Sequence, residues 1–419
     1  MSKLVRMAVI GAGARGRGYA KFALAFPDRL KIVAVADPDD FRRNRMAKEH
    51  GIPEESCFRS WQEFCSHPKM CDVVAICTQD SMHEAPAIAC AKLKYHILLE
   101  KPMAPTAQAC RNITAAVKEA GVMFVVCHVL RYTQYTKMLR QIIQSGEIGK
   151  IVSIQHLEPV GYWHQAHSFV RGNWRNEAQS SNMLLAKCCH DLDWLRFIMA
   201  QPCKSVHSFG TLFHFKASEK PAGAADRCID CPREIESSCP YSAYKIYFRD
   251  RFCKGGKLWP VDVLTPEVTA ENLSEALRKG PYGRCVYACD NDVVDNQVVN
   301  MVFENGATAS MTMTAFNPHS GRLTRIFGTL GYIDTDSSVI RVTKFLDDSV
   351  RTIDTKVAND GGILSGHGGG DFGLMDAFVR ALAENDPSQI LSGVDETLES
   401  HLMVFAAEES RKKGSVENL

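Results

Sequence analysis

Short apolar runs alternate with helical segments through the first third of the chain. The first run ends at Ile10, and others cover residues 30–37, 71–78, 95–100 and 122–129. Strands of a parallel sheet are buried on both faces, so they form continuous apolar runs with helices between them. The pattern predicts an α/β domain over residues 1–128 that is built on a doubly wound parallel sheet.

The pattern changes after residue 128. Strand-like runs follow at residues 149–158, 205–215, 297–316 and 333–345, and Glu304-Asn305-Gly306 is a strong hairpin signal. Helical periodicity returns from residue 368 onward. We expect a second α/β domain over residues 129–419, with an open, mostly antiparallel sheet and C-terminal helices that pack back on the first domain.

Length and charge agree with this division. A chain of 419 residues exceeds what one hydrophobic core usually serves, so two domains are expected.

The 49 basic and 48 acidic side chains leave a net charge of +1, which excludes a broad positive electrostatic field for binding nucleic acid or an anionic membrane. The chain has neither a signal-peptide pattern nor a run of about 18 apolar residues. We expect a cytoplasmic protein with a small, roughly neutral partner.

A glycine-rich turn follows the first apolar run. Gly11, Gly13 and Gly16 stand between that run and a helical segment, in the order that a dinucleotide-binding Rossmann domain requires. Gly11 permits a tight turn, Gly13 lets the backbone approach a pyrophosphate, and Gly16 lets helix and strand pack closely. We expect this turn, with Ala14 and Arg15, to bind the cofactor at the helix N-terminus.

The second apolar run predicts which nicotinamide cofactor is preferred. It ends in Asp37, 21 residues after Gly16, where a carboxylate accepts hydrogen bonds from the ribose hydroxyls. The same carboxylate repels a 2′-phosphate, so NAD is favoured over NADP. Arg42 and Arg43 lie nearby and leave NADP open.

Several motifs resemble one family. The segments GAGARG, ADPD, CTQDSMHEAPAIAC, LLEKPMA and CHDLD are similar to those of the Gfo/Idh/MocA family of sugar and cyclitol dehydrogenases. The resemblance implies a Rossmann domain, a C-terminal α/β domain with an open sheet, and a cofactor between them. It also implies that Thr78, Gln79 and His83 line the nicotinamide ribose side, and that Glu100 and Lys101 reach the nicotinamide and the substrate.

Residues 184–195, LLAKCCHDLDWL, predict one two-faced helix. Family members often carry D-x-G-x-H-x-x-D on the helix that faces the nicotinamide. That pattern places the histidine at His190 and the last aspartate at Asp193, but Ala186 replaces the first aspartate. Lys187 and Asp191 lie on the same polar face, and a surface helix with a solvated polar side is the alternative.

The chemistry of alcohol oxidation gives these residues roles. His190 has a suitable pKa to act as the base. Lys101 and Lys187 would supply positive charge to the developing alkoxide and keep His190 neutral. We expect these three residues to be catalytic and Asp191 to contact the substrate.

An aromatic segment predicts further substrate contacts. Tyr162, Trp163 and His164 lie in a segment able to stack on a sugar ring, and Arg131 and His367 are candidate neighbours. Clusters of this kind also occur where loops pack, so packing is the alternative.

One group among the sixteen cysteines has metal-ligand spacing. Cys228 and Cys231 form a C-x2-C pair, Cys239 follows closely, and Cys285 is the preferred fourth member, within an insertion over residues 226–290. Four thiolates predict a structural zinc site. Free thiols and an iron–sulfur cluster are the alternatives. The resemblance includes a subgroup with such cysteines.

We therefore expect an NAD(P)-dependent oxidoreductase that acts on a hydroxyl of a sugar, sugar acid or cyclitol. One alternative is a glycosidase that oxidises its sugar transiently, eliminates and then reduces again. Another, motivated by Ala186, is a non-catalytic NAD(P)-binding regulator. The expected partners are a small carbohydrate-like substrate and further copies of the chain, forming a dimer or tetramer through the C-terminal sheet.

Overall fold

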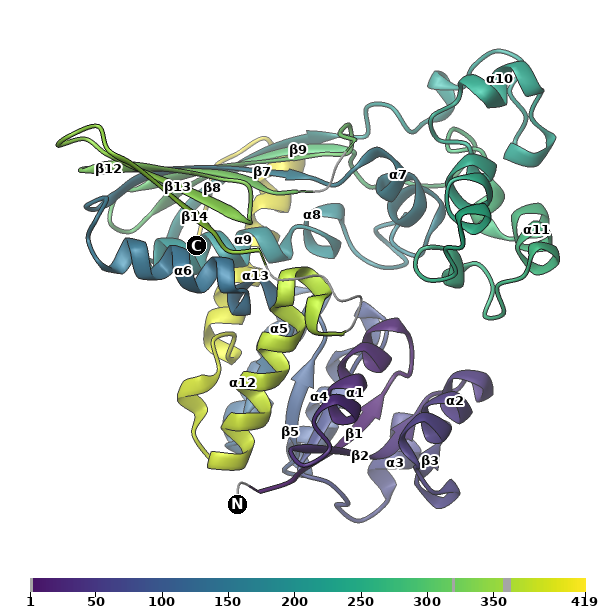
Figure 1. Cartoon of the computed structure of the whole chain (residues 1–419), viewed down its shortest axis with the longest axis horizontal. Coiled ribbons are helices and arrows are strands. Elements are labelled where there is room, and N and C mark those ends of the chain that lie inside the picture. The colour runs from purple at the N-terminus through teal and green to yellow at the C-terminus, as the bar shows by residue number, and fades with distance from the viewer. Residues whose placement is uncertain (1–2, 319–320, 357–362) are drawn as a thin grey trace.

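The computed structural model describes residues 3–318, 321–356 and 363–419. A parallel sheet of six strands, in the order β3-β2-β1-β4-β5-β6, forms the centre of the first domain (Figure 1). The strands are β1 (Val5–Ile10), β2 (Leu30–Ala36), β3 (Cys57–Phe58), β4 (Val73–Ile76), β5 (His96–Leu99) and β6 (Phe124–Val126). The predicted doubly wound sheet is confirmed.

Helices cover both faces of this sheet. They are α1 (Ala14–Ala25), α2 (Asp40–His50), α3 (Trp61–Ser66), α4 (Glu84–Lys92) and α5 (Ala107–Ala120). Asp39, Ser60 and Thr106 cap α2, α3 and α5, because each side chain accepts a hydrogen bond from a backbone N–H of the first turn. These caps explain where the helices begin.

A helix from the far end of the chain completes the core of the first domain. α12 (Gly370–Glu384) lies beside α1 and β1, and its Leu374 and Phe378 pack in one cluster with Val5 and Phe22. α13 (Val394–Lys413) then runs between the domains and contacts both α5 and α9. The two domains therefore share their C-terminal helices.

The second domain is built on a nine-stranded sheet in the order β14-β13-β12-β11-β7-β10-β9-β8-β15. Its strands pair antiparallel except β7 with β10, which confirms the predicted, mostly antiparallel sheet. The strands are β7 (Ile151–Pro159), β8 (Cys203–Thr211), β9 (Asn296–Phe303), β10 (Thr308–Thr314), β11 (Leu323–Gly328), β12 (Gly331–Thr335), β13 (Val339–Lys344), β14 (Val350–Asp354) and β15 (Glu417–Asn418). The predicted hairpin joins β9 and β10, where Gly306 has a φ of +83°.

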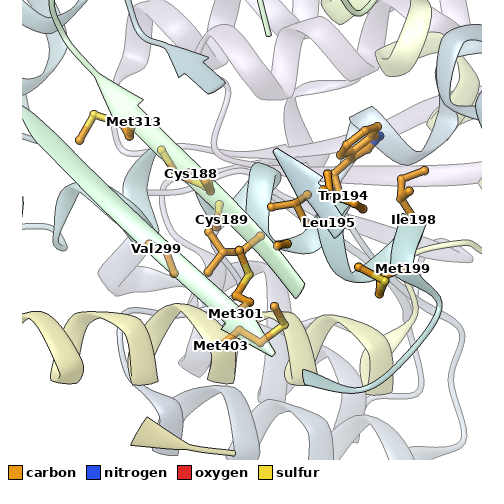
Figure 2. Packing of buried hydrophobic residues seen from close by; sticks show 14 of the residues in the cluster. Cys188, Cys189, Trp194, Leu195, Ile198, Met199, Val299, Met301, Met313 and Met403 are labelled. Atoms are coloured by element: carbon orange, nitrogen blue, oxygen red, sulfur yellow. The ribbon is translucent and has the colours of Figure 1, made fainter. Parts of the chain in front are cut away.

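One face of this sheet is covered by α6 (Gln134–Gln144), α9 (Cys189–Met199) and α13 (Figure 1). Burial alternates along β9, so Val299 and Met301 point toward these helices and pack with Leu195 and Met403 (Figure 2). The opposite face is open. Phe209, Val298 and Val302 are exposed there, at 59%, 36% and 39%.

An irregular insertion lies between β8 and β9 and stands to one side of the sheet, beside α7 (Tyr162–His164) (Figure 1). It contains α10 (Arg233–Ser238), α11 (Ala270–Lys279) and short single turns. Its own core includes Tyr241, Tyr247, Val261, Leu273 and Tyr282. None of the described helices combines the length and the apolar character that a membrane crossing needs.

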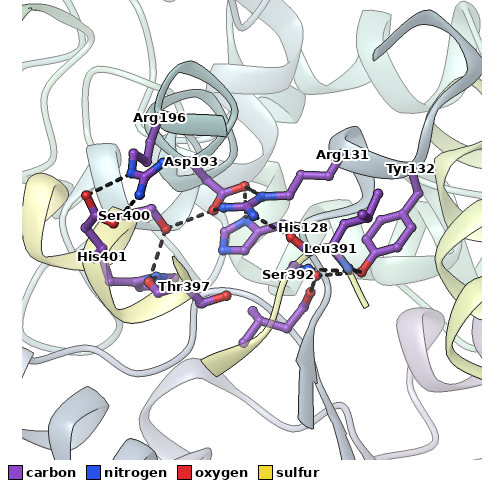
Figure 3. A network of polar contacts seen from close by, with 12 residues as sticks. His128, Arg131, Tyr132, Asp193, Arg196, Leu391, Ser392, Thr397, Ser400 and His401 are labelled. Atoms are coloured by element: carbon purple, nitrogen blue, oxygen red, sulfur yellow. Dashed lines mark hydrogen bonds and ion pairs between the residues drawn. The ribbon is translucent and has the colours of Figure 1, made fainter. Parts of the chain in front are cut away.

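A buried ion pair fixes α9 against the segment that follows β6. Arg131, after β6, donates two hydrogen bonds to Asp193, at 2.8 and 2.6 Å, and both side chains are 1% exposed (Figure 3). Ser400 of α13 also donates to Asp193, at 2.9 Å. Burial opposes ionisation of Asp193, but the charge of Arg131 outweighs it and holds the pKa of the carboxyl below its usual value.

The substrate role expected for Arg131 does not fit this position. Its guanidinium is fully buried, and it donates to the carbonyl of Leu391 as well as to Asp193. No part of the side chain is left to reach a ligand, so Arg131 is structural.

We predict that Arg131→Met lowers the free energy of unfolding by about 3–5 kcal/mol, because it leaves the Asp193 carboxylate buried without its partner. Arg131→Met combined with Asp193→Leu should recover much of that loss. Chemical denaturation measures both effects.

Arg140→Met is the matched control. Arg131 and Arg140 both lie over the Phe197 ring, at 4.7 and 4.2 Å, but Arg140 is only partly buried on α6. Losing that contact alone should cost about 1 kcal/mol or less. Equal losses in Arg131→Met and Arg140→Met would contradict the role given to the ion pair.

Candidate active site

The glycine turn between β1 and α1 has the geometry of a dinucleotide site. Gly11 has a φ of +94°, and a Cβ there would stand 2.5 Å from the carbonyl oxygen of Cys77. A Cβ on Gly16 would stand 2.1 Å from the carbonyl oxygen of Gly11, so only glycine lets the helix approach the strand. Gly13 has open space in front of it, and Ala14 follows as the first residue of α1. An anion can therefore approach the free N–H groups at this helix N-terminus.

Asp37 follows β2 and is held in place by two backbone groups. Its carboxylate accepts hydrogen bonds from the N–H of Ala12, at 2.7 Å, and of Asp39, at 2.9 Å. Arg43 is occupied, because it donates to the carbonyl of Asp37 at 2.7 Å and pairs with Asp40. Arg42 is exposed on α2.

Arg15 belongs to a buried ion network. Its guanidinium contacts Glu100 at 2.6 Å and Asp371 of α12 at 2.8 Å, and it also donates to the hydroxyl of Tyr19. Burial opposes ionisation of Glu100, but the charges of Arg15 and Lys101 outweigh it and keep the pKa of the carboxyl low. Arg15 and Glu100 therefore join the glycine turn to the EKP segment and to α12.

The TQD segment after β4 divides into exposed and buried parts. Gln79 is exposed in a groove that the second domain lines with Arg175 and Ser180, and Thr78 is half-buried. His83 is fully buried, and its ring nitrogens lie 2.8 Å from the carbonyl oxygen of Pro102 and 3.2 Å from that of Thr78. The expected contact of His83 with the nicotinamide ribose does not fit, because its ring instead ties two loops together.

The predicted helix over residues 184–195 is two short helices, α8 (Met183–Ala186) and α9, with Lys187 and Cys188 between them. The alternative of a solvated polar face is also wrong, because His190, Asp191 and Asp193 are all buried. At the break, Lys101 from the first domain donates a hydrogen bond to the carbonyl of Ala186, at 2.9 Å. Lys101 thus contacts the backbone oxygen of Ala186, the residue at which the family pattern has its first aspartate.

His190 is buried, within the electrostatic influence of Lys101. It is 8% exposed, and its Nδ1 has no hydrogen-bond partner among the described residues. Burial, followed by the positive charge of Lys101, lowers the pKa of His190 well below its usual value. The ring of His367 lies 6.3 Å away, and that histidine is held by Asp371 at 3.1 Å. His190 is therefore a neutral imidazole, as a general base must be.

A cluster of ion pairs lies beside His190. Lys187 contacts Glu158 at 3.2 Å, and Arg322 contacts Glu158 at 2.9 Å and Asp191 at 2.5 Å. His156 also bonds to Asp191, at 2.9 Å. Asp191 has no exposed surface, so the substrate contact expected of it does not fit.

Sequence reasoning did not identify Glu158, Arg322 or His156. Two of them could have been found from their position, because Glu158 and His156 lie at inward-facing sites of β7. Arg322 precedes β11 and carries no motif, so only the fold reveals that it lies between the two carboxylates.

The aromatic segment borders the same region. Trp163 stacks on His164, with ring centroids 5.6 Å apart, and Trp259 of the insertion packs against both rings. Burial, followed by the charge of Lys187, lowers the pKa of His164 well below its usual value. Tyr162 is half-buried against Tyr241. His164 is therefore within the electrostatic influence of Lys187.

Cys228, Cys231, Cys239 and Cys285 line one small cavity. Arg171 is buried beside them and donates to the Cys228 sulfur at 3.4 Å. In the described part of the chain, however, no three His, Cys, Asp or Glu side chains stand close enough to hold a metal ion. The structure brings the predicted cysteines together but does not show a zinc site.

Two family models match the chain. Residues 5–128 match the NAD-binding Rossmann fold of an oxidoreductase family, and residues 140–418 match its C-terminal alpha/beta domain.

Curated relatives match at low identity. One is 2,7-anhydro-N-acetylneuraminate hydratase of Escherichia coli (strain K12), 28% identical over 208 residues, which are 49% of this chain and 53% of the relative. Another is myo-inositol 2-dehydrogenase of Thermotoga maritima, 25% identical over 210 residues, which are 50% of this chain and 59% of the relative. These alignments span little more than half the length of each relative.

Solved structures share the whole fold. A levoglucosan dehydrogenase in complex with NADH and levoglucosan has a TM-score of 0.71 at 19% identity, covering 99% of both chains. An oxidoreductase from Agrobacterium radiobacter in complex with NAD+, L-tartaric acid and magnesium also has a TM-score of 0.71, at 14% identity, covering 99% of this chain and 98% of its own. Because both domain models match and together cover nearly the entire sequence, the chain belongs to the Gfo/Idh/MocA oxidoreductase family.

Proposed function

We propose that the protein transfers a hydride between a nicotinamide cofactor and a hydroxyl-bearing carbon of a sugar, sugar acid or cyclitol. The observation that carries this proposal is the meeting of Lys101, from the first domain, with the break before His190, from the second. The ammonium group of Lys101 is then near enough to the imidazole of His190 for its charge to lower the pKa of that histidine. Alcohol oxidation needs this pair of groups together with a hydride acceptor.

The roles of the two side chains follow from their charges. His190 takes the proton of the reacting hydroxyl at a ring nitrogen, and Lys101 donates a hydrogen bond to the same oxygen as negative charge develops. The nicotinamide, when bound, accepts the hydride. Lys187 is balanced by Glu158, so we assign it to orienting the substrate and not to adding net charge.

The remaining site residues fit a cofactor that spans the first domain. Gly11, Gly13, Ala14 and Gly16 would hold the pyrophosphate at the start of α1, and Asp37 would accept from the ribose. Thr78 and Gln79 would lie beside the nicotinamide half. Because Arg43 is already paired, we propose that NAD is preferred over NADP.

Ala186 favours a second candidate, a regulator that binds NAD(P) without turnover, because it removes the carboxylate that family members carry. Incubation with NAD and a panel of free and glycosylated sugars separates the possibilities. NADH accumulation supports the dehydrogenase, and release of the aglycone without net NADH supports the glycosidase. Cofactor binding with neither product supports the regulator.

We expect Lys101→Met and His190→Ala each to lower kcat by about two orders of magnitude or more, the range for lost proton transfer or charge stabilisation. Affinity for NAD, measured by calorimetry, should change little. Lys187→Met should mainly raise KM. Unchanged turnover in both Lys101→Met and His190→Ala would place the chemistry elsewhere.

The pH profile gives a separate test of the same pair. The lowered pKa of His190 means that this base stays deprotonated below the usual histidine value of about 6.5. The acid limb of kcat/KM for oxidation should therefore lie below that pH. Lys101→Met removes a positive charge that lowers this pKa, so its residual activity should show an acid limb at higher pH. If the acid limb of Lys101→Met lies at the same pH as that of the parent, Lys101 does not influence the pKa of His190.

For the cofactor, we predict that Asp37→Ala weakens NAD binding and narrows its advantage over NADP, because the ribose loses an acceptor and a 2′-phosphate loses a repelling charge. Calorimetric titration with both cofactors measures the change. Stronger binding of NADP to the unmodified protein would overturn the argument and make Arg42 the dominant residue.

We also propose that the four cysteines bind one structural zinc. Support comes from their convergence on one cavity and from the buried Arg171, which donates a hydrogen bond to the Cys228 sulfur. Elemental analysis should give about one zinc per chain, lost in Cys228→Ser together with folding of the insertion. Cys253→Ser, at an exposed cysteine, is the control. Metal-free protein purified without chelator would contradict the proposal.

For assembly, we propose that two copies pair through the open face of the nine-stranded sheet, where Phe209, Val298 and Val302 are exposed. A monomeric mass in light scattering at micromolar concentration would contradict it.

A further inference from the structure

A cavity of about 320 Å³ lies beneath the nine-stranded sheet, between β11–β14, α6 and α9. This volume is within the range of small-molecule sites, about 300–1,000 Å³. Three aromatic rings form one wall, since Trp194 stacks on Tyr135 with centroids 6.1 Å apart and on His156 at 5.3 Å. Hydroxyl groups supply much of the rest, from Thr133, Thr136, Thr324, Ser337, Ser338 and Thr355.

The cavity lies next to the candidate active site and shares two neighbours with it. His367 lines it, and the ring of that residue lies 6.3 Å from that of His190. Arg322 also lines it and reaches Glu158 and Asp191 on its other side. Trp194 lies four residues after His190 on α9, so both side chains project from one face of the helix. His367 is therefore the residue that stands between His190 and the cavity.

One buried hydroxyl in the cavity wall is only loosely bonded to the protein. Tyr135 is 8% exposed, and its hydroxyl interacts with those of Thr324 and Thr335 but makes no hydrogen bond of normal geometry with any described residue. Because buried polar groups usually make well-formed hydrogen bonds, this hydroxyl is suited to a further partner, a polar ligand or water in the cavity.

We infer that this cavity binds a second sugar or cyclitol ring, linked to the ring whose hydroxyl reacts at His190. The inference rests on the proposed function and narrows its substrate to a two-ring compound. An aromatic wall suits the apolar face of a sugar, and surrounding hydroxyls suit its polar edge. Arg322 and Lys356 are basic and no described lining residue is acidic, so a neutral or acidic second ring fits better than a basic one.

The test compares single rings with two-ring sugars on the NAD-loaded protein. D-Glucose, D-galactose, N-acetyl-D-glucosamine and myo-inositol are matched with maltose, lactose, chitobiose and galactinol. NADH formation gives kcat/KM, and the shift in unfolding temperature reports binding. At least one two-ring sugar should have a kcat/KM about tenfold above both of its component rings, the gain expected from one or two added hydrogen bonds.

Two variants connect that preference to the cavity. Tyr135→Phe should lower kcat/KM for the two-ring sugar roughly two- to tenfold and leave the single ring unchanged. Ser338→Phe should fill the cavity and abolish the preference. Ser349→Phe is the matched control, because Ser349 bonds to Asp347 as Ser338 bonds to Asp336 but lies in a distant exposed hairpin.

The outcomes separate this inference from the proposed function. If a single ring is oxidised as well as any two-ring sugar, the inference fails and the dehydrogenase stands. If no sugar is oxidised but a two-ring sugar stabilises the parent and not Ser338→Phe, the cavity stands and the redox proposal fails. If no two-ring sugar is either oxidised or bound in preference to its components, the inference is overturned.

Discussion

The buried pair of Arg131 and Asp193 is the contact on which the site depends. It joins the segment after β6 to α9, and through Ser400 to α13, with both charged groups almost completely removed from water. Three stretches of chain from two domains thereby meet at one carboxylate. Because an unpaired charge at this depth would be costly, α9 has few other positions to adopt. His190 precedes Asp193 by less than one turn, so its place opposite Lys101 follows from this pairing.

Around that anchor, charge is distributed unevenly. Glu158 and Asp191 balance Lys187 and Arg322, and Glu100 and Asp371 balance Arg15. Lys101 instead donates to a neutral carbonyl. Its positive charge acts on several neighbours, and Glu100 and His190 are two of them. Burial alone would also keep the imidazole of His190 neutral, but the lysine adds a second contribution in the same direction.

Local sequence signals predicted much of the architecture. The continuous apolar runs, the Gly11 turn and the Asn305-Gly306 hairpin are dictated by nearest neighbours, so both sheets could be predicted from them. The predictions that failed concern residues whose bonding partners are distant in the sequence. Asp191 and Arg322 are separated by 131 residues, and Arg131 and Asp193 by 62. A charged residue looks available for a ligand until its partner is known, and this is why the sequence alone suggests substrate contacts for Arg131 and Asp191. The hydrophobic periodicity of residues 184–195 also gives no indication that the helix is interrupted at Lys187.

The position of α12 has a consequence for how the protein is made. Leu374 and Phe378 belong to the same core as Val5 and Phe22, yet Leu374 follows Phe22 by 352 residues in the chain. Domains of this size usually fold as units, the N-terminal one first, while the ribosome is still at work. Here the nucleotide-binding sheet leaves the ribosome long before the helix that covers part of it. The apolar surface that α12 covers therefore stays open while the strands of the second domain are being made.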